Sequence, residues 1–407
     1  MRLIVDRATP GLAWCDRVAD AAWPVAVALL CLDARYAAYL TVLVWLIWRL
    51  LLQVQRYPLA VVFLLLLGAQ AGQFVLERDL QPSSASDPLV IALGFVAMLG
   101  RTEAQWRCTL RWLALAIVPL ALWASGQDPS VRLALPVGGI NRLGFLLGLL
   151  QLSAWAAAGL SRSWWSCLGY STLVLVSVPI ILHNGSRVAF LAPPLAVAIT
   201  VVLAVWRRSE WLPQEWMVLL RWRRQILQAF LAGVLVMITV VARSWYLNPS
   251  VPGGNVLSDR GRIDTSLCWT RQPLRRGEEK LLFGLGYNQK VQRYCGSKAL
   301  PSMAEAGRPD GLPHAHNLFA QVVAENGLLG LLSLGSVLVL LARQVFMDVA
   351  GQGAFSRRLF FYGVPLLLYL AMNGLVSSFQ LFLMTNQLLI GLGLASLWRG
   401  PQSESIP

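Results

Sequence analysis

Long apolar runs recur along this 407-residue chain, and few charged residues separate them. Hydrophobic residues make up 57% of the chain and charged residues only 13%, against a charged share of ~25% in ordinary soluble domains. Only lipid solvates so much apolar surface with so few charges, which excludes a disordered chain, a secreted disulfide scaffold or a soluble nucleic-acid binder. The sequence therefore predicts a membrane protein with lipids, and no nucleic acid, as partners.

A helix that crosses a membrane needs ~20 mostly apolar residues. By this measure we predict an all-α fold, a polytopic membrane helix bundle of about twelve transmembrane helices, with eleven or ten as alternatives. Trp164 and Trp165 at the start of one span are typical of interfacial anchors. The clear spans begin near Tyr36, Tyr57, Val137, Trp164, Val188, Gln225, His316, Leu359 and Gln380, and weaker ones begin near Ala19, Pro88 and Cys108.

The Lys and Arg residues predict the orientation. With the N-terminus inside, eighteen of them fall in cytoplasmic segments and four in short external loops, as the positive-inside rule requires. We therefore expect both termini in the cytoplasm, and we see no cleavable signal peptide. The expected organisation is nine transmembrane helices in 1–245, one long external loop region in 246–315, three transmembrane helices in 316–398 and a cytoplasmic tail in 399–407.

The external stretch 246–315 contains ten cations and six acids. Cys268 and Cys295 both lie in it, and an oxidising compartment would allow a disulfide that pins the loop. Two free thiols are the alternative, because sequence does not fix the distance between them. A positive surface suited to anionic lipid, diphosphate or an acidic glycan is expected from Arg260, Arg271, Arg275, Arg276 and Arg293.

All three histidines, His183, His314 and His316, fall at expected external span ends. A histidine at a wet membrane boundary titrates near neutral pH and can act as a general base. The alternative role is an interfacial polar residue, which we prefer for His183.

The stretch that begins at His316 predicts a close helix contact. Ala320, Val323, Gly327 and Gly330 follow His316 on one helical face, and the two glycines allow a neighbouring helix to approach. Glu325 lies off this face, below the expected membrane surface. An ionisable group there predicts either a functional role or a helix-to-helix hydrogen bond made by a protonated Glu.

Several short segments share a pattern. HNLFAQVVAENGLLGLL follows an external loop that contains FGLGYNQ; Asn141-Arg142 lies in GGINRLGFLLG, Ser186-Arg187 in NGSRVAFLA, and Arg262 in DRGRIDTSLCW. In order and spacing these segments resemble the O-antigen ligase and O-antigen polymerase superfamily, whose pattern is His-Asn followed by Glu-x-Gly-x-x-Gly. The resemblance covers about the second half of the chain.

The resemblance implies an inverting, metal-independent glycosyltransferase of the bacterial inner membrane, with its active site facing the periplasm and no cofactor. Its donor would be a glycan linked to polyprenyl (undecaprenyl) diphosphate, and its acceptor a hydroxyl of lipid A core or another glycan. The family pattern implies His316 as the catalytic base and Arg187, Arg262 and Arg142 as diphosphate binders. Guanidinium groups suit this task because they bind phosphate oxygens in pairs.

His314, Asn317, Arg260 and Glu325 are accessory candidates. His314 is an alternative base, although the pattern selects His316 because Asn317 follows it directly. Arg260 is an alternative to Arg262, because Trp269 comes later than the pattern leads us to expect. Without the resemblance, Arg187 would be interpreted as a snorkelling anchor and Arg262 as a solvated loop charge.

Other functions compete with this hypothesis. A polymerase that extends lipid-linked repeats, or an enzyme that transfers the glycan to protein, would use the same kind of donor; we favour a ligase narrowly, because the loop does not obviously supply a second lipid-diphosphate site. A secondary transporter or flippase would show repeated halves and ionisable groups near the midplane. The sequence shows no such repeat, and a structural or receptor role has no positive support in it.

Overall fold

In the computed structural model, most of the residues that it describes lie in helices. No strand occurs within these ranges, which confirms the predicted all-α class for this part of the chain. The described residues are 18–56, 90–136 except 92 and 100, 139–206 except 162, 225, 228, 259–285, 291, 294–296, 300, 315–351, 358–376 and 384–397.

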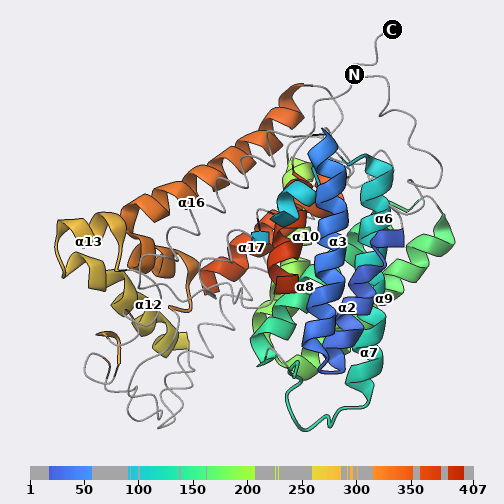
Figure 1. Ribbon diagram of the computed structural model, residues 1–407, viewed down its shortest axis with the longest axis horizontal. Helices are drawn as coiled ribbons and strands as arrows, with labels where there is room; N and C mark the ends of the chain where they lie inside the picture. Colours follow the sequence, from blue (N-terminus) through green and yellow to red (C-terminus); the bar gives the residue numbers. More distant parts are fainter. Residues whose placement is uncertain are drawn as a thin grey trace.

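Figure 1 shows α2, α3 and α6 to α10 side by side in one bundle, with α12, α13 and the start of α16 to one side of it. The principal helices, in chain order, are α2 (Ala22–Cys31), α3 (Arg35–Arg56), α6 (Glu103–Leu115), α7 (Ile117–Ser125), α8 (Gly139–Gly159), α9 (Trp164–Asn184), α10 (Arg187–Trp206), α12 (Asp259–Leu274), α13 (Glu278–Phe283), α16 (Leu318–Gly351), the π-helical turn η2 (Leu359–Gly363), α17 (Val364–Val376) and α18 (Met384–Ala395).

Four described segments are long and apolar enough to cross a membrane, and they match the spans predicted near Cys108, Val137, Trp164 and Val188: Glu103–Ser125, Arg142–Gly159, Trp164–Asn184 and Val188–Val205. Shorter apolar helices cover Ala22–Cys31, Leu318–Leu332 and Leu359–Gly374. The segments predicted to begin near Tyr57 and Gln225 lie almost wholly outside the described residues. The total of about twelve spans therefore stays a prediction.

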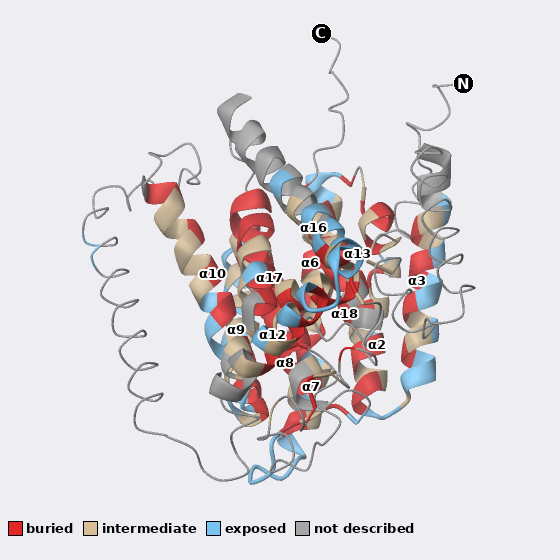
Figure 2. Ribbon diagram, turned by 90° about the vertical axis from the view of Figure 1, so that its left-hand side faces the viewer, coloured by how far each residue is buried: buried red, intermediate tan, exposed pale blue. Residues whose placement is uncertain are grey.

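The outward sides of the bundle helices are apolar. Figure 2 shows exposed residues along one side of α3, where Leu40, Val44, Ile47 and Leu51 leave between 49% and 60% of their surface uncovered. A helix on the surface of a soluble protein places polar residues on this side. At the start of α9, Trp164 and Trp165 are 72% and 78% exposed, as interfacial anchors would be. Both features fit a bundle surrounded by lipid.

A buried cluster of charged side chains ties α2, α3 and α6 together. Asp20 is 0% exposed, and its Oδ1 accepts hydrogen bonds from Arg49 Nη2 at 2.5 Å and Trp45 Nε1 at 3.0 Å. Its Oδ2 lies 2.7 Å from Thr109 Oγ1 and 3.2 Å from Arg101 Nη1. Arg49 and Arg101, which are among the eighteen cations counted in the predicted cytoplasmic segments, are both buried and paired with this one carboxylate.

Helix α12, the described residues between 291 and 296 and the start of α16 share a second, smaller core. Helix α13 contacts α12 and α16 without a buried residue of its own, and we call this whole assembly the α12–α16 unit. Its buried residues are Trp269, Val291, Cys295, Ala315, Ala320 and Ala324. Helix α16 also contacts α17, and α17 packs against α10. Thus α17 links the α12–α16 unit to the bundle.

Candidate functional site

Helix α12 is held against the residue that precedes His316. Its buried side contains Thr265, Trp269 and Gln272, which are at most 6% exposed. Next to Thr265, the hydroxyl of Ser266 donates a hydrogen bond to the carbonyl oxygen of Ala315 at 2.6 Å. This bond joins two segments that are far apart in the chain, and it places α12 beside the start of α16.

His316 lies where the chain turns into α16. Its backbone φ is 56°, in the left-handed region that a non-glycine residue seldom adopts and that often marks a functional turn. Asn317 then caps the helix, because its Oδ1 accepts the N–H of Ala320 at 3.0 Å. The cap and the turn together fix the backbone that carries the partly buried His316 side chain.

Two glycines allow the end of α13 to cross α16 with backbone against backbone. Gly284 has a φ of 79° and Gly327 a φ of 66°, so both adopt conformations that glycine tolerates best. A Cβ atom on Gly327 would lie 2.3 Å from the carbonyl oxygen of Leu282, and one on Gly284 would lie 2.3 Å from the backbone of Glu325. No side chain fits at either position without displacing main chain.

This crossing corrects the predicted helical face. The helix does not run unbroken from His316 to Gly330, because Gly327 has non-helical angles. Before the break, the carbonyl of Ala324 accepts the N–H of Leu285 at 2.9 Å. The close neighbours of Gly327 are therefore Leu282, in the last turn of α13, and Gly284, which follows that helix. The close approach of a neighbouring helix was predicted from the sequence, but the break in α16 at Gly327 was not.

Replacing Gly327 with alanine should destabilise this crossing, because the new Cβ would meet backbone atoms in a left-handed conformation. We expect a cost of about 1–3 kcal/mol and loss of hydrogen-exchange protection at the Leu285 amide. Gly335 is the matched control on the same helix, since a Cβ there meets nothing within 4 Å. Equal exchange at Leu285 in both alanine variants would contradict the assigned role.

The register of α12 bears on which loop arginine is the family counterpart. Arg262, Ser266 and Trp269 follow one another at steps of four and three, so they share one side of the helix. Arg260 is two residues from Arg262 and belongs to the opposite side. The seven-residue spacing to Trp269 equals two helical turns. The side chains of both arginines lie outside what the structure describes, so the choice between them stays a prediction.

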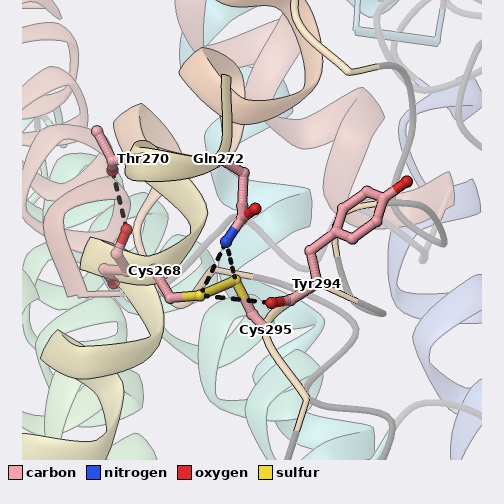
Figure 3. The surroundings of a disulfide bond; sticks show 6 residues. Cys268, Thr270, Gln272, Tyr294 and Cys295 are labelled. Carbon is pink, nitrogen blue, oxygen red and sulfur yellow. Dashed lines mark hydrogen bonds between the residues drawn. A yellow bond between two sulfur atoms is a disulfide. The ribbon is translucent and has the colours of Figure 1, made fainter. Parts of the chain in front are cut away.

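The predicted bridge between Cys268 and Cys295 is present in the structure. It joins α12 to the segment around 294–296, and Figure 3 shows the Gln272 side chain directed at the two sulfurs, 3.5 and 3.8 Å from Nε2. Cys295 is fully buried in the small core. The bridge therefore ties α12 to the small core.

The other motif residues gather at the turn between α9 and α10. Ser186 accepts the N–H of Ala189 at 3.3 Å and so caps α10, whose first residue is Arg187. A Cβ on Gly144 would lie 2.8 Å from the Cβ of Ser186, so α8 packs closely on this turn. Arg142 lies half a turn earlier on α8. The GGINR and NGSR segments are therefore neighbours.

Sequence reasoning missed the residues that hold this turn. Arg132, in the α7–α8 connection, donates to the carbonyls of Asn184 at 3.3 Å and Gly185 at 2.7 Å. The ring Nε2 of His183 lies 3.1 and 2.9 Å from the carbonyls of Asp128 and Val131. The His183 ring is therefore in contact with the backbone of the α7–α8 connection, and its preferred role as an interfacial polar residue stays a prediction. The only local sequence signal for this turn was the pair Asn184-Gly185 at the end of α9, because such a pair is typical of a helix C-terminus.

Of the four accessory candidates, the structure describes the side chains of Asn317, which caps α16, and Glu325, whereas His314 and the Arg260 side chain lie outside the described residues. Glu325 is 8% exposed, and its Oε1 accepts a hydrogen bond from Gln321 Nε2 at 3.2 Å. This bond lies within α16, and both alternatives for Glu325, a functional role and a helix-to-helix hydrogen bond, stay predictions. His314 and the side chains of Arg187 and Arg262 lie outside what the structure describes. Their convergence with His316 therefore stays a prediction.

No protein-family model and no curated protein matches this chain.

Proposed function

We propose that this chain is an inverting membrane glycosyltransferase of the O-antigen ligase and polymerase kind, and more narrowly a ligase. The observation that carries the proposal is the contact between Ser266 and Ala315, which sets the helix of Arg262 beside His316. Two motif segments that resemble the family thus lie together in one unit with its own core.

The positions of the three principal residues suit an anionic donor. Arg187 is the first residue of α10, Arg262 lies in the first turn of α12, and His316 precedes α16. Helix N-termini favour negative charge because backbone N–H groups point outward there. Three such ends, two of them at arginine, fit a diphosphate group.

In the proposed reaction, the His316 imidazole accepts the proton of an acceptor hydroxyl. The acceptor oxygen attacks the anomeric carbon opposite the diphosphate, a new C–O bond forms, and the sugar–phosphate bond breaks with inversion. The electron pair leaves with the polyprenyl diphosphate, whose added charge Arg187 and Arg262 stabilise. His316 then releases its proton to solvent.

The direct test is transfer by purified protein in liposomes that contain a polyprenyl diphosphate-linked glycan. We expect glycan transfer without an ion gradient or ATP. Lipid A core should be the preferred acceptor, whereas preference for a second lipid-linked repeat would indicate a polymerase. Movement of the donor across the bilayer with no transfer product would instead support a flippase and contradict the proposal.

The arginines of α12 provide a paired test. Arg262→Gln should lower the transfer rate about 10- to 100-fold, because a charged hydrogen bond to the diphosphate contributes about 1.5–3 kcal/mol. Arg260→Gln removes the same charge from the opposite side of the helix and should have little effect. Loss of transfer in Arg260→Gln with retention in Arg262→Gln would overturn the assignment.

A further inference from the structure

Helix α12 has an outward side that mixes apolar and basic residues. Leu267, Arg271 and Leu274 share this side at steps of four and three. Leu267 is 46% exposed and Leu274 is 60% exposed, and Arg271 between them is exposed as well. If this side of α12 faced only water, both leucines would expose apolar surface to solvent, which is unfavourable.

The same mixture continues into α13. Leu282 and Phe283 at its end are 44% and 63% exposed. Arg275 and Lys280 nearby are also exposed. We call Leu267, Arg271, Leu274, Arg275, Leu282 and Phe283 the α12–α13 surface.

We propose that the α12–α13 surface lies in the headgroup layer of the membrane and binds anionic phospholipid. Hydrocarbon would not solvate its arginines, and water would not cover its leucines and phenylalanine. At the membrane interface, apolar side chains enter the acyl boundary while arginines extend to lipid phosphates. Charge complementarity identifies the lipid as anionic, since a basic side chain near such a surface contributes about 1 kcal/mol of attraction.

The opposite side of α12 makes this surface rigid. The disulfide and the contacts with α16 fix α12, so little ordering is required when lipid binds. Arg276 already stacks on Tyr294, 3.4 Å from the ring centroid. We therefore assign the lipid contacts to Arg271 and Arg275. The proposal is independent of the glycosyltransferase activity.

The test uses the full-length protein in nanodiscs, with a benzophenone amino acid placed singly at Leu274, Phe283 or Ser130. Ser130 is an exposed control in the α7–α8 connection. After irradiation, intact mass should reveal phospholipid adducts at Leu274 and Phe283 and few at Ser130. Adduct yield should rise when phosphatidylglycerol replaces part of the phosphatidylcholine.

The charge is tested by Arg271→Gln combined with Arg275→Gln. This double variant should abolish the rise with phosphatidylglycerol while the Cys268–Cys295 bridge, checked by mass mapping, stays intact. Equal adduct yields at all three positions, or adducts to protein or glycan in place of lipid, would overturn the proposal. The proposal would also be overturned if the adduct yield of the double variant still increased with phosphatidylglycerol.

Discussion

Replacing His316 with alanine should lower the rate of glycan transfer by ~10²- to 10⁴-fold, the usual contribution of a positioned general base. The protein should keep its fold, because Asn317 and not His316 caps α16. Binding of the lipid-linked donor should change little, since the diphosphate contacts are assigned to arginines. Transfer by the purified variant in liposomes, with donor binding measured separately, checks both expectations.

His183 supplies the matched control. His183→Ala removes the Nε2–H that the carbonyls of Asp128 and Val131 share, which should cost about 1 kcal/mol of stability but leave transfer within a few-fold of the unaltered protein. His314→Ala tests the alternative base. If His314→Ala abolished transfer and His316→Ala retained it in folded protein, the base would be misassigned.

Asp20→Asn should produce the largest loss of stability. The substitution keeps the shape of the side chain but removes the carboxylate charge that two buried guanidiniums, Arg49 and Arg101, share. Loss of one partner of a buried ion pair typically costs about 3–5 kcal/mol, because it leaves uncompensated charge away from water. Denaturant unfolding in a single detergent, followed by circular dichroism, measures the difference.

Asp33→Asn is the control for charge alone. Asp33 is exposed between α2 and α3 with a φ of 59°, a conformation that Asn also tolerates. Its replacement should change stability by less than about 0.5 kcal/mol. Adding Arg49→Gln to Asp20→Asn should recover part of the loss. Identical unfolding of the two Asn variants would show that the buried cluster does not stabilise the bundle.

Four membrane spans and the disulfide could be predicted from the sequence. The signal for a span is local, and the signal for the disulfide is the presence of two cysteines in one hydrophilic segment. Trp164–Asn184 and Val188–Val205 are long, predominantly apolar segments without a charged residue, and both are helical in the structure. Cys268 and Cys295 are the two cysteines of one hydrophilic stretch, which limited their partners. Neither prediction required knowledge of which distant segments pack together.

The features that sequence missed depend on contacts between distant segments. A lone Asp20 near a span gave no sign of meeting Arg49 and Arg101, because the pairing requires three packed helices. Gly327 in an apolar run resembled a small residue on a helical face, and only the crossing of α13 shows why the helix breaks there. For the candidate site, sequence nominated His316 and Arg262, and three-dimensional contacts were needed to relate their segments.

The small core of the α12–α16 unit also constrains how the protein is made. Trp269 and Cys268 leave the ribosome before Cys295, Ala320 and the rest of α16, which cover them in the finished structure. The buried side of α12 must therefore stay uncovered during part of synthesis, when exposed apolar surface promotes aggregation. Chaperones and thiol oxidants on the side of the membrane where this stretch emerges would act within that interval.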